Sequence, residues 1–482
     1  MLACARLMST MVFGTDGWRD VIADGFTVAR VRRAARAYGQ HLHDAGGGMV
    51  LVAHDTRFGG PLFQAAVAAT LRDVGLPVRV HDGPLPTPLL SFAVRELGAV
   101  GGVMLTASHN AAPYHGFKLK GAYGGTVTSA TYDDVSARAA GLADEPEAPP
   151  LRTEFAHFDV REAYFRHVRD LLDLDVLRAW RGRLVHDAMH GAAAGWIAAF
   201  ATWAGLPWQV EAVRASADPT FGGASPEPIP ATLGALTERL AAADPVSTLG
   251  VATDGDGDRL AVVAADAVPF TAHAVLALLL DHLDQRGTPG RVVKTVTVSR
   301  LVERLAQARG REVLETPVGF KYLVEALLAG DVMVAGEESG GFGVAGHIPE
   351  RDGILNALLV TEALARGRQP LPERLAELER EARWRHAYDR ADLALAGSAE
   401  LERVLRRLAS DPTRFADLPV RSVERRDGVK LNLGDDRWLM LRASGTEPVL
   451  RLYAEGPDDA AVADLLAAAR AFVSRTAQPS SR

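Results

Sequence analysis

The sequence predicts an α/β protein with mainly parallel sheets, because one pattern of strand, loop and helix recurs along it. Three apolar runs of strand length each precede a loop of small, hydroxyl-bearing and acidic residues: "GAVGGVMLTASHN", "STLGVATDGDGDR" and "GDVMVAGEESGG". Amphipathic segments typical of helices lie between them, at residues 31–46, 274–287 and 301–310. Such alternation implies parallel sheets, which bind ligands at the carboxyl ends of their strands. We therefore expect each polar loop to lie at such an end.

A fourth segment, residues 436–456, has a different pattern. It reads "DRWLMLRASGTEPVLRLYAEG", with polar and apolar residues alternating on both sides of S-G-T-E-P. This alternation predicts paired antiparallel strands around a turn. Candidate domain boundaries lie at residues 143–154, 266–270 and 365–375, where the pattern is interrupted.

Composition limits the class of protein. The chain has 482 residues, 48% hydrophobic and 23% charged, which is ordinary globular composition with length for three or four domains. Its one cysteine, Cys4, excludes an internal disulfide, and the N-terminal stretch has no apolar run that fits secretion or membrane insertion. A net charge of -7 argues against broad nucleic-acid binding. We therefore expect a cytoplasmic protein without nucleic-acid or membrane partners.

The loop "TDGDGDR", residues 253–259, is a candidate metal site. Asp254, Asp256 and Asp258 repel one another, and the glycines between them let all three point to one centre, where a divalent cation would make the arrangement favourable. An EF-hand loop would need an acidic residue at its twelfth position, which here is Ala265, and the flanking segments are typical of strands. A solvated acidic turn remains an alternative. Mg²⁺ fits better than Zn²⁺, because no histidine or cysteine lies nearby in the sequence.

Two further stretches suit phosphate chemistry. "TASHN", residues 106–110, would by itself most often be a turn or helix cap, and it lacks the Gly-x-Ser-x-Gly elbow of α/β-hydrolases. "RASGTEP", residues 442–448, offers backbone N–H groups, two hydroxyls and, with Arg451, two guanidinium groups for a phosphate dianion. A structural hairpin is its alternative interpretation. The conjunction of these stretches with an acidic metal loop favours the functional interpretation.

The chain resembles the α-D-phosphohexomutases, the family that includes phosphoglucomutase and phosphomannomutase. The resemblance runs from Phe13 to Glu455 and rests on six motifs in the family's order: "FGTDGWRD", "TASHN…YHGFKLK", "DGDGDR", "ETPVGFKY", "GEESGG" and "RASGTEPVLRLYAE". It implies three related α/β domains and a smaller C-terminal α+β domain around a central cleft. We expect these domains at residues 12–148, 155–265, 266–370 and 380–475.

The same resemblance assigns roles to residues. Ser108 is expected to carry the transferable phosphoryl group, with Lys118 as the first choice for proton transfer, His109 as the second and Arg19 positioning charge. Ser108 and the three aspartates would bind Mg²⁺. The implied substrate-binding residues are Arg259, Gly319, Lys321, Glu337, Ser339, Arg442, Ser444, Gly445, Thr446 and Arg451.

The expected reaction is the reversible interconversion of α-D-glucose 1-phosphate and glucose 6-phosphate by an isomerase, through glucose 1,6-bisphosphate, which also acts as activator. The resemblance also bears on the substrate. Phosphomannomutase-type and phosphoglucosamine-type members of the family commonly have methionine or glutamine where this chain has Glu338, and histidine where it has Gly341, so these two residues favour a glucose phosphate. The alternatives are a mutase for mannose, glucosamine or pentose phosphates, a hexose bisphosphate synthase, or a silent sugar-phosphate-binding protein. The expected partners are hexose phosphates, and the expected assembly is a monomer or homodimer. The chain also departs from the family after His109 and Asn110, where Ala111, Ala112 and His115 replace two prolines and an asparagine.

Overall fold

A computed structural model of the chain describes residues 11, 13–14, 16–144, 154–395, 398–408, 412–434, 436–443 and 449–477. The chain divides into two compact units. The first comprises residues 1–290 and 319–374, and the second comprises residues 291–318 and 375–482. None of the helices within these described ranges combines the length and apolar character needed to cross a membrane.

The first unit begins with a mixed seven-stranded sheet. Its strands in spatial order are β1 (Trp18–Val21), β5 (Tyr114–Gly121), β4 (Gly101–Leu105), β2 (Val50–His54), β3 (Val78–Pro84) and β7 (Ala156–His157), with β6 (Gly125–Thr126) beside β5. Strands β2, β3 and β4 pair in parallel, and β5 pairs antiparallel with β4 and β1. The helices of this part are α1 (Val28–Asp44), α2 (Gly60–Asp73), α3 (Thr87–Glu96) and α4 (Ser129–Ala140). Every residue of β2 and β4 is buried, which explains why these strands are continuous apolar or glycine-rich runs.

A second sheet follows in the same unit, with the order β11-β10-β8-β9. Strands β8 (Arg183–Asp187), β9 (Gln209–Val213) and β10 (Thr248–Thr253) are parallel, and β11 (Leu260–Val263) is antiparallel to β10. Its helices are α5 (Arg161–Leu171), α6 (Leu174–Ala179), α7 (Trp196–Trp203) and α8 (Gly234–Leu240), with two 3₁₀ turns, η1 (Phe221–Gly223) and η2 (Pro230–Thr232).

The rest of the first unit contains the antiparallel pair β14 (Val332–Gly336) and β15 (Phe342–Val344). The accompanying helices are α9 (Ala272–Gln285), α11 (Phe320–Ala329) and α12 (Gly353–Gly367). The expected helices at 274–287 and 31–46 are α9 and α1, and the three predicted strands are β4, β10 and β14. Each polar loop does follow the carboxyl end of its strand, as predicted.

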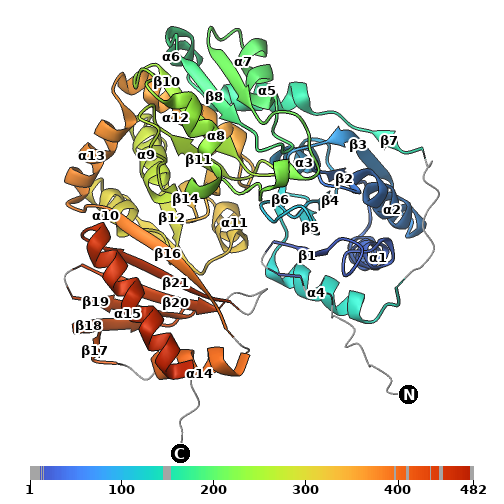
Figure 1. The fold of residues 1–482 in the computed structure, drawn as a ribbon. Helices are drawn as coiled ribbons and strands as arrows, with labels where there is room; N and C mark the ends of the chain where they lie inside the picture. The colour runs from blue at the N-terminus through green and yellow to red at the C-terminus, as the bar shows by residue number, and fades with distance from the viewer. Residues whose placement is uncertain are drawn as a thin grey trace, which may run out of the picture. The chain divides into compact units, whose positions relative to one another are not determined.

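The second unit has a parallel pair, β12 (Arg291–Thr295) and β13 (Val313–Thr316), with the predicted helix α10 (Arg300–Ala308) between them in sequence. Helix α13 (Leu371–Ala382) precedes a six-stranded antiparallel sheet. The strands of that sheet in spatial order are β16 (Ala387–Ala394), β21 (Val449–Gly456), β20 (Trp438–Ala443), β19 (Val429–Leu433), β18 (Leu418–Glu424) and β17 (Arg414–Phe415). Helix α15 (Asp459–Ala477) packs on β16 and β21, and α14 (Ser398–Leu408) packs against α15 (Figure 1). The predicted α/β class with a C-terminal α+β domain is confirmed.

Candidate active site

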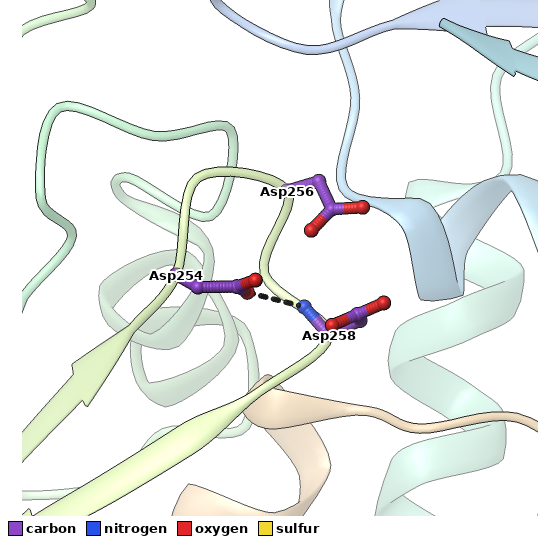
Figure 2. Close-up of side chains that lie close together, drawn as sticks. All are labelled: Asp254, Asp256 and Asp258. Atoms are coloured by element: carbon purple, nitrogen blue, oxygen red, sulfur yellow. Dashed lines mark hydrogen bonds between the residues drawn. The ribbon is translucent and has the colours of Figure 1, made fainter. Parts of the chain in front are cut away.

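Three aspartates lie together in the loop between β10 and β11. Their side chains are fully buried, and carboxylate oxygens of Asp254, Asp256 and Asp258 lie within 4.8 Å of one another. Figure 2 shows the hydrogen bond that closes this loop, in which the Asp258 N–H donates to Asp254 Oδ1 at 3.0 Å. The Arg259 N–H donates to the same oxygen at 3.1 Å. The turn therefore holds the three carboxylates around one centre, as the residue pattern predicted.

This cluster fits a hard divalent cation. The Oδ1 atoms of Asp256 and Asp258 are buried and accept no hydrogen bond from the described residues. Burial and then the neighbouring Asp256 and Asp258 raise the pKa of Asp254 well above its usual value, which reflects crowded negative charge. A cation would relieve this crowding, and an all-oxygen ligand set is the one that Mg²⁺ prefers. Asp254, Asp256 and Asp258 are the residues that would hold it.

Lys118 faces the same centre from β5. Its Nζ lies 2.9 Å from Asp256, 3.1 Å from Asp258 and 2.9 Å from Asp16. Burial alone would lower the pKa of Lys118, but Asp16, Asp256 and Asp258 outweigh burial and raise this pKa above its usual value. The Thr87 hydroxyl donates to Asp256 Oδ2 at 2.5 Å. Lys118 is therefore a fixed ammonium that can stabilise negative charge.

Ser108 lies in the loop that follows β4. Its hydroxyl donates to Asp254 Oδ2 at 2.6 Å, although 146 residues separate the two along the chain. Gly255 permits this approach, because a Cβ there would lie 2.6 Å from the Ser108 carbonyl oxygen. The backbone of Ser108 is left-handed, with φ of 53°, which costs a non-glycine residue about 1 to 2 kcal/mol. The fold thus brings the predicted phosphoryl carrier against the predicted metal loop.

His109 is part of this serine loop, and Arg19 contacts the loop from β1. His109 Nδ1 is 3.3 Å from Ser108 Oγ. Burial, followed by the charges of Arg259 and Arg19, lowers the pKa of His109 well below its usual value, so the imidazole is neutral. Arg19, on β1, donates to the Asn110 side-chain oxygen at 2.6 Å and so contacts the loop through Asn110.

Glu337 begins the predicted sugar-binding loop, directly after β14. Its N–H donates to the Gly341 carbonyl at 3.1 Å, which closes the loop, and Ser339 is half-buried within it. The Glu337 side chain is buried, and burial raises its pKa to about 7. A carboxylate held this way can accept hydrogen bonds from ligand hydroxyl groups.

Arg351 is a residue of this site that the sequence analysis missed. Its buried guanidinium lies 2.7 Å from Asp16, 2.6 Å from Asp258 and 3.4 Å from Glu337. A Cβ at Gly341 would lie 2.2 Å from Arg351 Cδ, so the arginine stem fills the space that a side chain at residue 341 would need. A side chain at residue 341 would therefore have to displace Arg351. Asp16, within the motif "FGTDGWRD", was missed as well.

Three other predicted residues of this unit have local contacts. Arg259 Nη1 lies 3.7 Å from Glu227. Lys321 Nζ lies 5.1 Å from the centre of the Tyr322 ring. Gly319 caps α11 with φ of 131°, a backbone conformation that favours glycine. Within the described ranges, Lys321 makes no contact with Ser108 or with the aspartates.

The predicted phosphate-binding residues lie in the second unit. Arg442 on β20 and Arg451 on β21 are directly opposite each other in the antiparallel register. Arg442 Nε donates to Asp427 at 2.8 Å, and Arg451 Nε lies 3.9 Å from Asp392. Both strands of the predicted pair therefore form and carry one arginine each. Ser444, Gly445 and Thr446, which connect them, lie outside the described residues.

His115 explains one departure from the family pattern. Its ring stacks on Phe26 with centroids 4.8 Å apart and contacts Phe63 edge-on at 5.1 Å. His115 is fully buried, and burial lowers its pKa to about 3. It is therefore a neutral core residue and not part of the loop's chemistry.

Comparison with known families gives matches along most of the chain. Four models described as phosphoglucomutase/phosphomannomutase match in order. Those of alpha/beta/alpha domains I, II and III match residues 10–144, 162–267 and 271–381, and that of the C-terminal domain matches residues 394–471.

Individual proteins are similar over nearly their whole length. A phosphoglucosamine mutase of Frankia alni is 31% identical over 98% of this chain and 100% of its own. A phosphoglucomutase/phosphomannomutase of Thermococcus kodakarensis is 27% identical over 93% of this chain and 95% of its own. The crystal structure of a "putative phosphomannomutase" from Thermus thermophilus is 41% identical, with a TM-score of 0.87, and covers 97% of this chain and 99% of its own.

Proposed function

We propose a substrate and a phosphoryl carrier for this chain, which belongs to the phosphoglucomutase/phosphomannomutase family and is a phosphohexomutase of the isomerase class. The proposed reaction is the reversible conversion of α-D-glucose 1-phosphate to glucose 6-phosphate, with Ser108 as carrier. The observation that supports it most is the hydrogen bond from the Ser108 hydroxyl to Asp254 at 2.6 Å. This bond lies in a buried cluster of carboxylate, ammonium and guanidinium side chains.

The proposed chemistry is two phosphoryl transfers in opposite directions. A sugar hydroxyl oxygen bonds to the phosphorus of phosphorylated Ser108 while the bond from phosphorus to Ser108 Oγ breaks, which gives glucose 1,6-bisphosphate. The bisphosphate turns end for end, and its other phosphoryl group returns to Ser108. Mg²⁺ bound by the three aspartates would offset the charge of the phosphoryl group and polarise it.

Two residues are our candidates for moving the proton of the sugar hydroxyl. Lys118, our first candidate, contacts Asp16, Asp256 and Asp258 as an ammonium and is the proposed source of the proton that is returned. His109, the second, lies 3.3 Å from Ser108 Oγ and is the proposed proton acceptor. In this proposal Glu337 and Ser339 hold the sugar hydroxyls. Arg442, Arg451 and the loop between them bind the phosphate that is not reacting.

The choice of glucose rests on the sugar-binding loop. Glu338 follows Glu337, and Gly341 makes room for Arg351, so this loop carries two acidic residues and contacts a buried guanidinium. Glucosamine phosphate is the second candidate, because the relative from Frankia alni is named a phosphoglucosamine mutase. Mannose phosphate is the third candidate, because the similar protein from Thermus thermophilus is named a phosphomannomutase.

Initial rates on the 1-phosphates of glucose, glucosamine, mannose and ribose test this choice, each reaction being primed with the matching bisphosphate. We expect kcat/KM to be highest for glucose 1-phosphate. A higher value for another sugar would transfer the assignment to that sugar. No turnover of any of them, with Ser108 never phosphorylated, would favour a sugar-phosphate-binding protein.

A further inference from the structure

A buried arginine lies beneath the Ser108 loop and contacts its backbone. Arg57 follows β2, and only 2% of its surface is exposed. Its guanidinium donates hydrogen bonds to four backbone carbonyl groups, three in the loop and one at the start of β5. These acceptors are Ser108 at 2.6 Å, Asn110 at 2.6 Å, Ala111 at 3.0 Å and Tyr114 at 2.9 Å.

The guanidinium is itself held in one plane. Its Nε donates to Asp55 Oδ2 at 3.1 Å, and the Arg57 N–H donates to Asp55 Oδ1 at 2.9 Å. The ring of Phe221 lies against it, with 4.8 Å between the Arg57 Cζ and the ring centre. Because a guanidinium presents its donors in a rigid fork, fixing its plane fixes the positions of all the carbonyl groups that it binds.

The same network holds the other side of Ser108. The Thr106 hydroxyl donates to Asp55 Oδ2 at 2.5 Å and accepts from the Ser108 N–H at 2.8 Å. The Ser108 N–H is therefore linked to Asp55 through Thr106, and the Ser108 carbonyl is linked to Asp55 through Arg57. The carbonyl and the next N–H point in opposite directions across a trans peptide, so the direction of the His109 N–H is fixed as well.

These contacts account for the left-handed backbone of Ser108. With φ of 53°, Ser108 has a backbone conformation that is unfavourable for a non-glycine residue unless other contacts stabilise it. The hydrogen bonds of Arg57 and Thr106 offset this cost and keep the Ser108 hydroxyl directed at Asp254. Pre-organisation of this kind matters for rate, because a displacement of about 1 Å can lower a rate about a hundred-fold.

We infer that Arg57 is a positioning residue for phosphoryl transfer, which sets the Ser108 loop in its reactive conformation without touching the substrate. The inference rests on the proposed role of Ser108 as phosphoryl carrier. Lysine cannot replace Arg57, because one ammonium cannot reach four carbonyl groups in the fixed geometry of the guanidinium fork.

The test uses the full chain with the substitution Arg57→Lys. We expect kcat for glucose 1-phosphate to fall about a hundred-fold with KM little changed, since binding of the sugar is not affected. The rate at which glucose 1,6-bisphosphate phosphorylates Ser108, followed by intact mass, should fall by the same factor. Arg30→Lys is the matched control, because Arg30 is also buried and bonded to a carboxylate and a carbonyl, those of Asp20 and Gly25, neither of which belongs to the Ser108 loop.

A second pair of variants separates positioning from folding. Thr106→Val keeps the shape of the side chain and removes the hydroxyl that accepts from Ser108, so it should slow phosphorylation, whereas Thr106→Ser should restore it. The inference is overturned if Arg57→Lys loses no more kcat than Arg30→Lys, or if Thr106→Val is phosphorylated at the wild-type rate. A wild type that is never phosphorylated on Ser108 would overturn the proposed function and this inference together.

Discussion

Replacing Glu337 by glutamine should stabilise the protein at alkaline pH while it lowers turnover. An ordinary glutamate has a pKa of 4.5, whereas burial raises the pKa of Glu337 to about 7 in the folded chain. Below 4.5 both states are protonated, so the carboxyl costs nothing. As the pH rises from 4.5 through 7, ionisation favours the unfolded state, and above 7 the full cost remains.

The size of this cost follows from the two pKa values. The gap between 4.5 and about 7 corresponds to about 3 kcal/mol, at about 1.4 kcal/mol per pH unit. Glutamine has nearly the same shape and does not ionise. Glu337→Gln should therefore unfold at a higher temperature than wild type near pH 8, and most of this gain should disappear near pH 5. Turnover of both glucose phosphates should fall, because the carboxylate that we assign to the sugar hydroxyls is gone.

The assay is thermal unfolding of wild type and variant at both pH values. Glu362→Gln is the control, because the pKa of Glu362 is shifted in the opposite direction, below its usual value. Burial would raise the pKa of Glu362, but the hydrogen bond and charge of His282 outweigh burial and lower it. That variant should therefore lose stability near pH 8. If Glu337→Gln were no more stable than wild type near pH 8, or gained equally at both values, the buried-carboxylate reasoning would be refuted.

Three further predictions concern other parts of the site. Asp256→Asn should weaken Mg²⁺ binding, measured by calorimetry, and lower kcat strongly, because a neutral amide offsets less of the cation's charge; unchanged activity at limiting Mg²⁺ would remove the loop as the metal site. Gly341→Ala should displace Arg351, whose Cδ would lie 2.2 Å from the new methyl group, and lower kcat/KM, whereas wild-type kinetics would show that Arg351 needs no fixed position. Arg442→Ala should lose about 1.5 to 3 kcal/mol of phosphate binding, about ten- to a hundred-fold in affinity, and should require added glucose 1,6-bisphosphate because the intermediate escapes. Normal melting with normal KM and no such requirement would exclude Arg442 from the site.

The alternation of strands and polar loops could be read from the sequence because it is local. The apolar runs before Ser108, Asp254 and Glu337 are strand-length segments that become buried, and each loop follows its strand directly. The alternating pattern around "RASGTEP" likewise predicted the antiparallel strands that carry Arg442 and Arg451. Periodicity and turn chemistry are sufficient for features of this kind.

Residues that act through distant partners could not be found this way. Arg351 lies 335 residues from Asp16 in sequence, and no local pattern around it suggests that it bridges Asp16, Asp258 and Glu337. The contacts of Arg57 could not be predicted either. Its guanidinium binds backbone carbonyl groups, which every residue has, so no side-chain pattern in the sequence indicates them. The charge states of Lys118 and His109 also depend on neighbours that only the folded chain brings together.

The most direct test of the account is whether the phosphoryl group of the substrate passes through Ser108 at the rate of turnover. The protein would be incubated with glucose 1,6-bisphosphate carrying labelled phosphorus, freed of excess reagent, and mixed rapidly with unlabelled glucose 1-phosphate. We predict that peptide mapping finds the label on Ser108 before mixing, and that the label leaves for sugar phosphate at least as fast as kcat. Turnover without label on Ser108, or release slower than kcat, would contradict the central claim.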